Sequence, residues 1–217
     1  MKKYLILTLV LISICCLGSG GFILLRTHHS AAQRSKPTAG AAKAMTSSSQ
    51  KAIEIAPTPA EINSHSVPPT DPRYISIAKL GIQKARVAPM SITTEGSIQA
   101  PTNIYDAGWY ADSAKPGQPG AMFIDGHIAG PHNTGIFAGL TQLAAGDTIT
   151  VEKGDGTVLT YAVDYVEQVP ADSVDMHKAL APYNADKQSL NLMTCGGTFD
   201  NQTNQYQNRI VVYASRT

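Results

Sequence analysis

Alternating apolar and polar residues, typical of half-buried strands, recur from residue 71 to the C-terminus. Residues 73–89 (RYISIAKLGIQKARVAP) predict two strands joined by a turn at Gly81. Residues 147–169 predict a hairpin, because Asp155-Gly156 is a favoured tight-turn pair between two β-rich runs. Residues 188–195 and 208–215 predict two further strands.

Helical signals in the same region are short. Residues 134–143 allow one or two turns, and residues 171–183 carry Asp172 or Ser173 as a candidate cap and Pro182 as a stop. Many short strands with few short helices predict a mainly β domain, built as a closed or nearly closed barrel.

The N-terminus differs in composition from the rest of the chain, with 22 uncharged residues between Lys3 and Arg26. As a helix these residues would span roughly 33 Å, close to the hydrocarbon thickness of a bilayer. Apolar residues resume after Gly18-Ser19-Gly20-Gly21, whereas a signal peptide has a shorter apolar stretch before its cleavage site. We therefore expect residues 1–26 to be an uncleaved anchor helix, with a cleaved signal as the alternative.

Residues 27–70 predict a flexible linker between this anchor and the domain at 71–217. They are rich in Ala, Ser, Thr and Pro and show no apolar periodicity. The alternative is a weak helix across residues 31–55, which would change the reach of the linker and not the function.

Charge is unevenly distributed along the chain. Residues 1–70 hold seven Lys/Arg and two Asp/Glu, whereas residues 71–217 hold ten and fourteen. An acidic domain lacks the basic face that phosphates require, so we expect no nucleic-acid partner. The basic excess beside the apolar segment indicates a membrane instead, although the charge count leaves the orientation open.

Three residues of the domain form a candidate catalytic set. Cys195 is its single cysteine, so an internal disulfide is excluded, and it stands between an apolar strand and Gly196-Gly197, where the strand is expected to stop. His127 follows another apolar run and opens a Gly/Pro-rich loop. Arg209 enters an apolar strand, which is costly for a guanidinium without an anionic partner.

Together these residue types predict acyl transfer through a thioester. A thiolate is the nucleophilic form of cysteine, and a nearby cation favours it. Histidine can protonate a leaving amine and deprotonate an incoming one. Arginine can bind a developing oxyanion or hold the carbonyls of a substrate.

From about residue 73 to 215 the chain resembles the sortases, the cysteine transpeptidases of the bacterial cell surface. The family's Thr-Leu-x-Thr-Cys stretch is matched at residues 191–195 (NLMTC), with Asn191 in place of the first Thr, and Arg209 follows in the next strand. "GWY" at 108–110, "PGQPGAMFIDGH" at 116–127, "GIFAGLTQLAAGDTITV" at 135–151 and "TCGGTFD" at 194–200 look most like the class E and F branches.

The resemblance implies an eight-stranded sortase barrel with His127, Cys195 and Arg209 as catalytic residues and Thr194 beside them at the substrate. It also implies an outside domain on a single-pass membrane anchor through residues 4–25. The implied substrates are surface or pilin proteins with an LPxTG-like C-terminal sorting signal. The implied amine acceptor is a peptidoglycan precursor or a pilin lysine.

Other readings fit the residues less well. No Cys-x-x-Cys or His-x-x-x-His pair supports a metal cage, and the spacing of Asp106, Asp112 and Asp125 matches no known calcium loop, so we expect neither metal nor cofactor. The remaining alternative is a catalytically inert, membrane-tethered β-barrel that binds partners in the cell envelope, with Cys195 as a buried small hydrophobe.

Overall fold

The protein is described by a computed structural model, which covers residues 52–94 and 96–217. Its strands are β1 (Pro72–Ile77), β2 (Ile82–Met90), β3 (Ala107–Tyr110), β4 (Ala121–Gly126), β5 (Thr148–Lys153), β6 (Val158–Pro170), β7 (Ser189–Asp200) and β8 (Gln205–Arg216). Its helices are α1 (Pro59–Ser64) and α2 (Met176–Ala179), with short 3-10 turns at η1 (Ala78–Leu80), η2 (Leu140–Gln142) and η3 (Ala171–Ser173).

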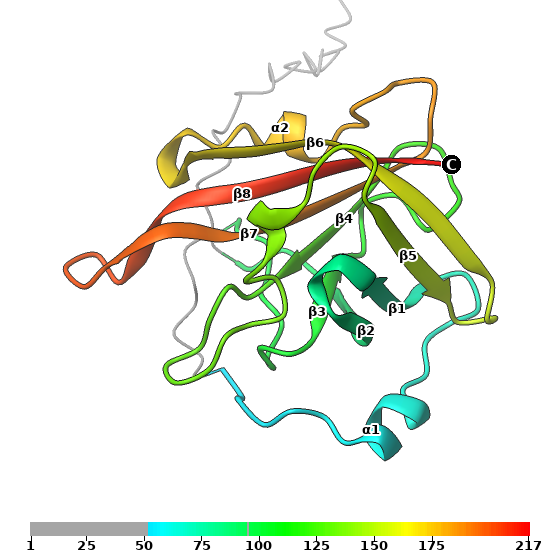
Figure 1. Cartoon of the computed structure of the whole chain (residues 1–217), viewed down its shortest axis with the longest axis horizontal. Coiled ribbons are helices and arrows are strands. Elements are labelled where there is room, and N and C mark those ends of the chain that lie inside the picture. Colours follow the sequence, from blue (N-terminus) through cyan, green and yellow to red (C-terminus); the bar gives the residue numbers. More distant parts are fainter. Residues whose placement is uncertain (1–51, 95) are drawn as a thin grey trace, which may run out of the picture. The chain divides into compact units, whose positions relative to one another are not determined.

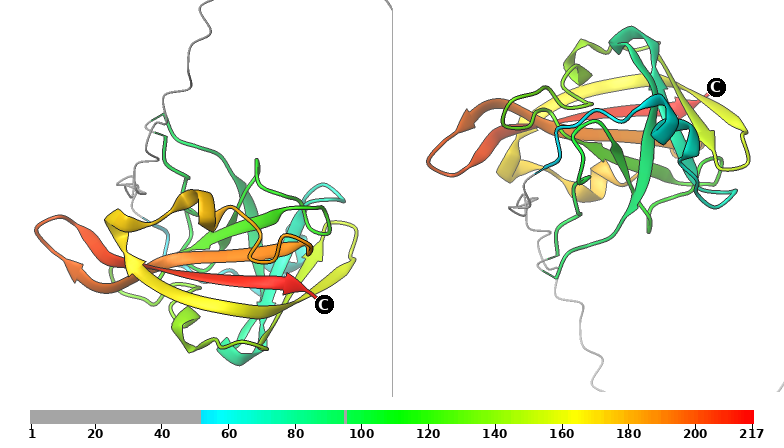
Figure 2. Two further views of the ribbon diagram at one scale, coloured as in Figure 1. Left: turned by 90° about the horizontal axis from the view of Figure 1, so that it is seen from above. Right: turned by 90° about the horizontal axis from the view of Figure 1, so that it is seen from below.

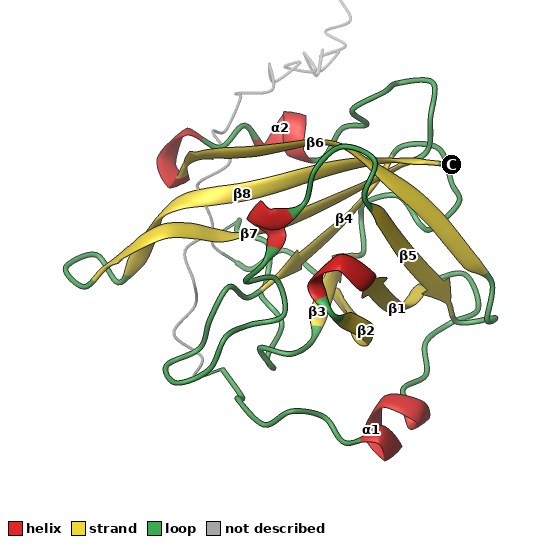
Figure 3. Ribbon diagram, viewed as in Figure 1, coloured by secondary structure: helices red, strands yellow, loops and turns green. Residues whose placement is uncertain are grey.

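The strands close into a barrel in the order β1-β2-β3-β4-β7-β8-β6-β5, which confirms the predicted eight-stranded fold (Figure 1). Neighbouring strands pair antiparallel, except for the parallel pairs β2–β3 and β4–β7. Short helices and turns lie outside the strands (Figure 3). The β7–β8 hairpin extends beyond the other strands (Figures 1 and 2).

Local sequence explains the hairpins at β1–β2 and β5–β6. Gly81 and Gly156 both have a positive φ, at 69° and 84°, which glycine adopts without steric cost. Both turns had been predicted from these glycines. The barrel interior is filled by side chains from all eight strands, with Phe137 and Leu140 packing from the segment between β4 and β5.

The segment 171–183 folds as η3 followed by α2. The predicted N-cap at Asp172 or Ser173 is wrong, because the carboxylate of Asp175 accepts hydrogen bonds from the backbone N–H groups of His177 and Lys178. An acidic cap satisfies amides that have no partner in the first helical turn. The helix therefore begins a turn later than the composition indicated.

The described part of the predicted linker contacts the barrel. Thr58 and Glu61 form a capping box at α1, and Pro59 occupies the first turn, where its missing N–H is not needed. The hydroxyl of Tyr74 in β1 donates to the carbonyl of Ile62. Figure 2 (right) shows the chain ahead of α1 crossing one side of the barrel.

Within residues 52–94 and 96–217, no helix is long and apolar enough to cross a bilayer. The predicted anchor at residues 4–25 lies outside the described residues.

Candidate active site

The candidate site is built where β4 and β7 run side by side in parallel. Asp125 pairs with Met193, and the hydroxyl of Thr194 donates to the carbonyl of Gly126 at 2.7 Å. Because His127 and Cys195 directly follow Gly126 and Thr194, this buried hydrogen bond holds the two chain positions next to each other.

Strand β8 brings the arginine to the same place. Arg209 is paired with Cys195 across the antiparallel β7–β8 ladder. Its side chain is only 4% exposed, and Nη1 donates to the carbonyls of Tyr206 and Asn208 at 3.2 and 2.9 Å. The guanidinium is therefore held inside the protein by its own strand.

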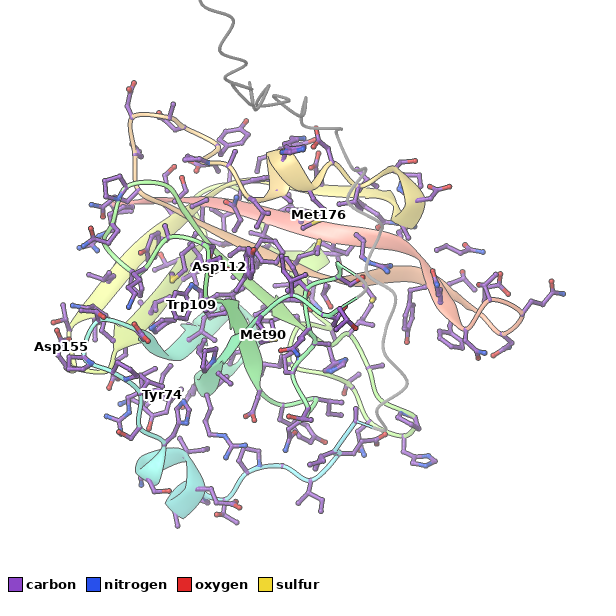
Figure 4. All side chains as sticks on the ribbon, turned by 180° about the vertical axis from the view of Figure 1, so that it is seen from behind. Tyr74, Met90, Trp109, Asp112, Asp155 and Met176 are labelled. Atoms are coloured by element: carbon purple, nitrogen blue, oxygen red, sulfur yellow. The ribbon has the colours of Figure 1, made fainter. Side chains whose placement is uncertain are left out.

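The side chains of Cys195 and Arg209 lie on the outer face of the sheet and not in the barrel interior. Met193 and Val211 belong to an apolar cluster outside the barrel, together with α2 residues, whereas Leu192 points into the barrel core. Side chains alternate along a strand, so Cys195 and Arg209 lie on the same outer face as Met193 and Val211. Figure 4 shows Met176 of α2 beside this face.

The apolar cluster covers the sheet next to the thiol. Its members are Phe123, Ala179, Met193, Val211 and Tyr213, packed against Ile98, Tyr110, Val174, Met176 and Leu180. Asn191 ties the α2 segment to β7, because its Nδ2 donates to the carbonyls of Ala179 and Ala181, both at 2.8 Å. Asn191 thus has a structural role where the family pattern has a threonine.

Burial dominates the chemistry of Cys195. Removal from water raises the pKa of the thiol, the Arg209 guanidinium lowers it, and the Asp125 carboxylate raises it further. The net effect is a pKa above the ordinary value for cysteine. A reaction through the thiolate depends on the positive charges brought near it.

Asp125 is a site residue that the sequence analysis missed, since it had been considered only as a calcium ligand. It is 6% exposed, and burial raises its pKa to about 7, against a hydrogen bond from the Gly126 backbone and the charge of Arg209. An acidic residue two positions before His127, inside an otherwise apolar strand, was the available signal.

His127 is held by backbone on two sides, and its contact with Pro101 was not predicted from the sequence. Its Nε2–H donates to the carbonyl of Pro101 at 2.7 Å, and its own carbonyl accepts from the N–H of Phe137. Gly135 packs so closely that a Cβ there would lie 2.3 Å from the His127 carbonyl oxygen. Both sides of the histidine are thus fixed by neighbouring backbone.

The strand does not stop at Cys195, as had been expected from Gly196-Gly197. β7 continues to Asp200, with a shift in register between Gly196 and Phe199. Gly197 has a φ of 73°, and a Cβ on Gly196 would lie 2.7 Å from Ile210. The two glycines therefore form a bulge directly after the thiol.

The described residues contain no group of three or more metal-ligating side chains. Asp106 forms a bidentate pair with Arg86, with both contacts at 2.8 Å, and Asp125 is buried. A hollow of about 370 Å³ lies between residues 56–62 and β2, and neither His127, Cys195 nor Arg209 lines it.

The family model described as the Sortase domain matches residues 75–217. No curated protein sequence matches the chain.

Several solved structures share the fold. A sortase from Actinomyces oris is 22% identical, with a TM-score of 0.51 over 67% of this chain and 79% of that one. The pilus-related sortase C of Group B Streptococcus is 21% identical, with a TM-score of 0.51 over 77% of this chain and 75% of that one. Sortase A from Corynebacterium diphtheriae is 22% identical, with a TM-score of 0.51 over 72% of this chain and 65% of that one. The expected class E or F subtype stays a prediction.

Proposed function

The chain belongs to the sortase family of cysteine transpeptidases, and on that premise we propose that Cys195 carries the acyl group of a cleaved sorting signal. The observation that supports this most directly is the pairing of Cys195 with Arg209 beside the end of β4, where His127 follows. In this proposal the substrate is a surface or pilin protein with an LPxTG-like C-terminal signal.

The proposed reaction has two steps. The Cys195 thiolate attacks the threonine carbonyl of the signal, and the C–N bond to the next residue breaks as His127, in its imidazolium form, gives its proton to the departing amine. An incoming amine, from a peptidoglycan precursor or a pilin lysine, then attacks the thioester. Its nitrogen loses a proton to neutral His127 as the thiolate leaves.

Arg209 is assigned to the developing oxyanion or to the peptide carbonyls. Its charge also favours the thiolate, since it lowers the pKa of Cys195 against the effect of burial. Substrate binding by Thr194 stays a prediction, because the residue is 1% exposed and its hydroxyl donates to the Gly126 carbonyl. In this proposal Thr194 acts by joining β7 to β4, which keeps Cys195 next to His127. We further propose that residues 4–25 anchor the chain in the cell membrane with the domain outside.

Replacement of the nucleophile tests the proposal. The full-length chain is incubated with a peptide containing Leu-Pro-Ala-Thr-Gly and with triglycine, and mass spectrometry follows a thioacyl adduct on Cys195 and the transpeptidated product. Cys195→Ala should abolish both species, because alanine cannot form a thioester. Cleavage of the peptide by Cys195→Ala at the wild-type rate would contradict the mechanism.

A further inference from the structure

Residues 53–55, which we term the N-terminal strap, run along the loop that holds His127. Ile53 and Asn103 form an isolated parallel bridge. The N–H of Ile53 donates to the Thr102 carbonyl at 2.8 Å, and the N–H of Ile104 donates to the Ile53 carbonyl at 3.0 Å. The Asn103 side chain adds a bond to the carbonyl of Ile55 at 2.9 Å. Three hydrogen bonds, two of which make up the bridge, thus dock the strap on residues 102–104.

Of the three residues of the strap, the polar one, Glu54, packs against the rest of the domain. Ile53 and Ile55 are 49% and 76% exposed, whereas Glu54 between them is half-buried. Hydrophobic burial alone would place the isoleucines inward and the carboxylate in water. The observed orientation therefore indicates that the Glu54 contact, and not apolar packing, determines how the strap sits.

Glu54 binds the loop that follows His127. Its two carboxylate oxygens accept from the N–H of His132 at 3.2 and 3.1 Å, and Oε2 accepts from Nδ2 of Asn133 at 2.8 Å. A Cβ on Gly130 would lie 2.5 Å from Oε1, so the missing side chain leaves room for the carboxylate. Hydrogen bonds to an ionised acceptor are stronger than neutral ones.

The two contacts of the strap converge on one imidazole. On one side, residues 102–104 follow Pro101, whose carbonyl accepts from Nε2 of His127. On the other side, residues 130–133 belong to the loop that begins at His127 and closes through the bond from Gly135 N–H to the Ile128 carbonyl. The strap therefore joins the two segments that set the position and the ring orientation of His127.

We propose that Glu54 is a positioning residue for His127, and that the strap couples the chain leading from the N-terminus to the proton-transfer step. This inference rests on the proposed function for the role of His127 in catalysis. Small displacements of a proton donor are costly: a misplacement of about 1 Å can lower a rate about 100-fold. None of residues 53–55 belongs to the apolar cluster beside Cys195, so we expect peptide binding to be little affected.

The kinetic test uses the full chain in detergent and the Leu-Pro-Ala-Thr-Gly peptide with triglycine. Glu54→Ala should lower kcat about tenfold while KM changes by less than about twofold, since only proton transfer is disturbed. The kcat of Glu54→Gln, which keeps one acceptor oxygen, should lie between those of the wild type and Glu54→Ala. Glu61→Gln is the matched control, because it removes the same charge from the neighbouring α1 cap and should leave kcat unchanged.

A double-mutant cycle tests the route of the effect. Asn133→Ala removes one donor to Glu54 without altering the strap. If both residues act through their shared contact, the double variant Glu54→Ala/Asn133→Ala should lose less kcat than the product of the two single losses. Losses that simply multiply would overturn the assigned contact.

The spectroscopic test does not need turnover. The full chain is labelled with 15N-histidine, and His127→Gln assigns the signals of that ring. Neutral wild-type His127 should show the Nε2–H tautomer, because Pro101 accepts from Nε2, and Glu54→Ala should add the Nδ1–H tautomer. His127 signals that superpose on the wild type would overturn the proposal. If the wild-type chain leaves the peptide uncleaved, the proposed function fails, and the His127 spectra still decide on the strap.

Discussion

At the scale of residues, a half-buried thiol lies between opposite charges. Partial burial and the Asp125 carboxylate raise the pKa of Cys195, and the Arg209 guanidinium lowers it. Both charged side chains are themselves almost fully buried. Charges in such an environment interact more strongly than at the surface, so single substitutions here should act mainly on ionisation and rate.

Arg209→Lys should reduce kcat/KM for the sorting peptide about 100-fold or more. An ammonium cannot reproduce the planar fork that bonds the Tyr206 and Asn208 carbonyls and still faces the thiol. Steady-state kinetics measure the loss. Arg73→Lys is the control, since Arg73 bonds the carbonyls of His65 and Asn63 near α1. Equal losses in both variants would remove Arg209 from its role.

Asp125→Asn should lower the pKa of Cys195. Ionised Asp125 disfavours a nearby thiolate, so an uncharged amide shifts the titration of the thiol to lower pH. The difference in reactivity between Asp125→Asn and the wild type should be largest above about pH 7. Burial raises the pKa of Asp125 to about 7, so its carboxylate is charged in the wild type only above that pH. The rate of alkylation by iodoacetamide as a function of pH measures the shift.

Asp112→Asn is the control for this measurement, because Asp112 acts on the pKa of Tyr110 and is no cause of the shift at Cys195. An unchanged alkylation profile in Asp125→Asn would show that its carboxylate does not reach the thiol.

At the scale of elements, the β7–β8 hairpin holds the register between Cys195 and Arg209. The bulge at Gly196 and Gly197 lets β7 continue past the thiol while its pairing with β8 shifts. A β-bulge commonly redirects a strand next to an active site. The hairpin therefore combines strand pairing with placement of the Cys195 thiol opposite Arg209.

Gly197→Ala should lower both stability and activity. Its φ of 73° costs an L-residue about 1–2 kcal/mol, and the new Cβ would lie 2.6 Å from the Asn208 side chain. Gly156→Ala is the matched control: φ is 84°, no atom lies within 4 Å, and the turn next to Asp155 lies on the other side of the barrel from the β7–β8 hairpin (Figure 4).

Denaturant unfolding and peptide cleavage are measured on both glycine variants. Each should lose stability, but only Gly197→Ala should also lose kcat in the folded fraction. A matching loss of kcat in Gly156→Ala would mean that the bulge has no specific role.

At the scale of the whole molecule, the barrel brings together residues that are far apart in the chain. Gly126 and Thr194 are 68 positions apart, yet parallel pairing of β4 and β7 joins them by a buried hydrogen bond. Strands β5 and β6 complete the other side of the closed sheet. Closure makes the relative position of His127 and Cys195 a property of the entire barrel.

Deletion of residues 4–25 should release the protein from the membrane. The 22 uncharged residues form an apolar segment long enough to span a bilayer. Their deletion removes the hydrophobic free energy that would hold the chain in the membrane. Fractionation of cells expressing the full and the deleted chain measures the distribution. Protease added to intact cells tests for an outside domain: full protection of the wild-type domain would contradict the proposed orientation.

The sequence alone predicts β1, β2, β5, β6, β8 and the first part of β7, together with the turns at Gly81 and Gly156, whereas β3 (Ala107–Tyr110) was not predicted. The catalytic roles of His127, Cys195 and Arg209 stay a prediction. Alternation of apolar residues and glycines with positive φ are local properties, so β1–β2 and β5–β6 could be read directly. The Cys195 motif and Arg209 were placed on two successive strand candidates, and their pairing as one hairpin was found only in the structure.

Which residues surround the thiol depends on contacts between segments that are distant in the chain. Asp125 and Pro101 enter the site through strand pairing and loop packing, which depend on contacts between distant segments. The bulge after Cys195 arises because Gly196 meets Ile210 of another strand. The docking of Glu54 on residues 132–133 likewise had no local signal, because a single carboxylate in a polar linker is uninformative until its partners are folded around it.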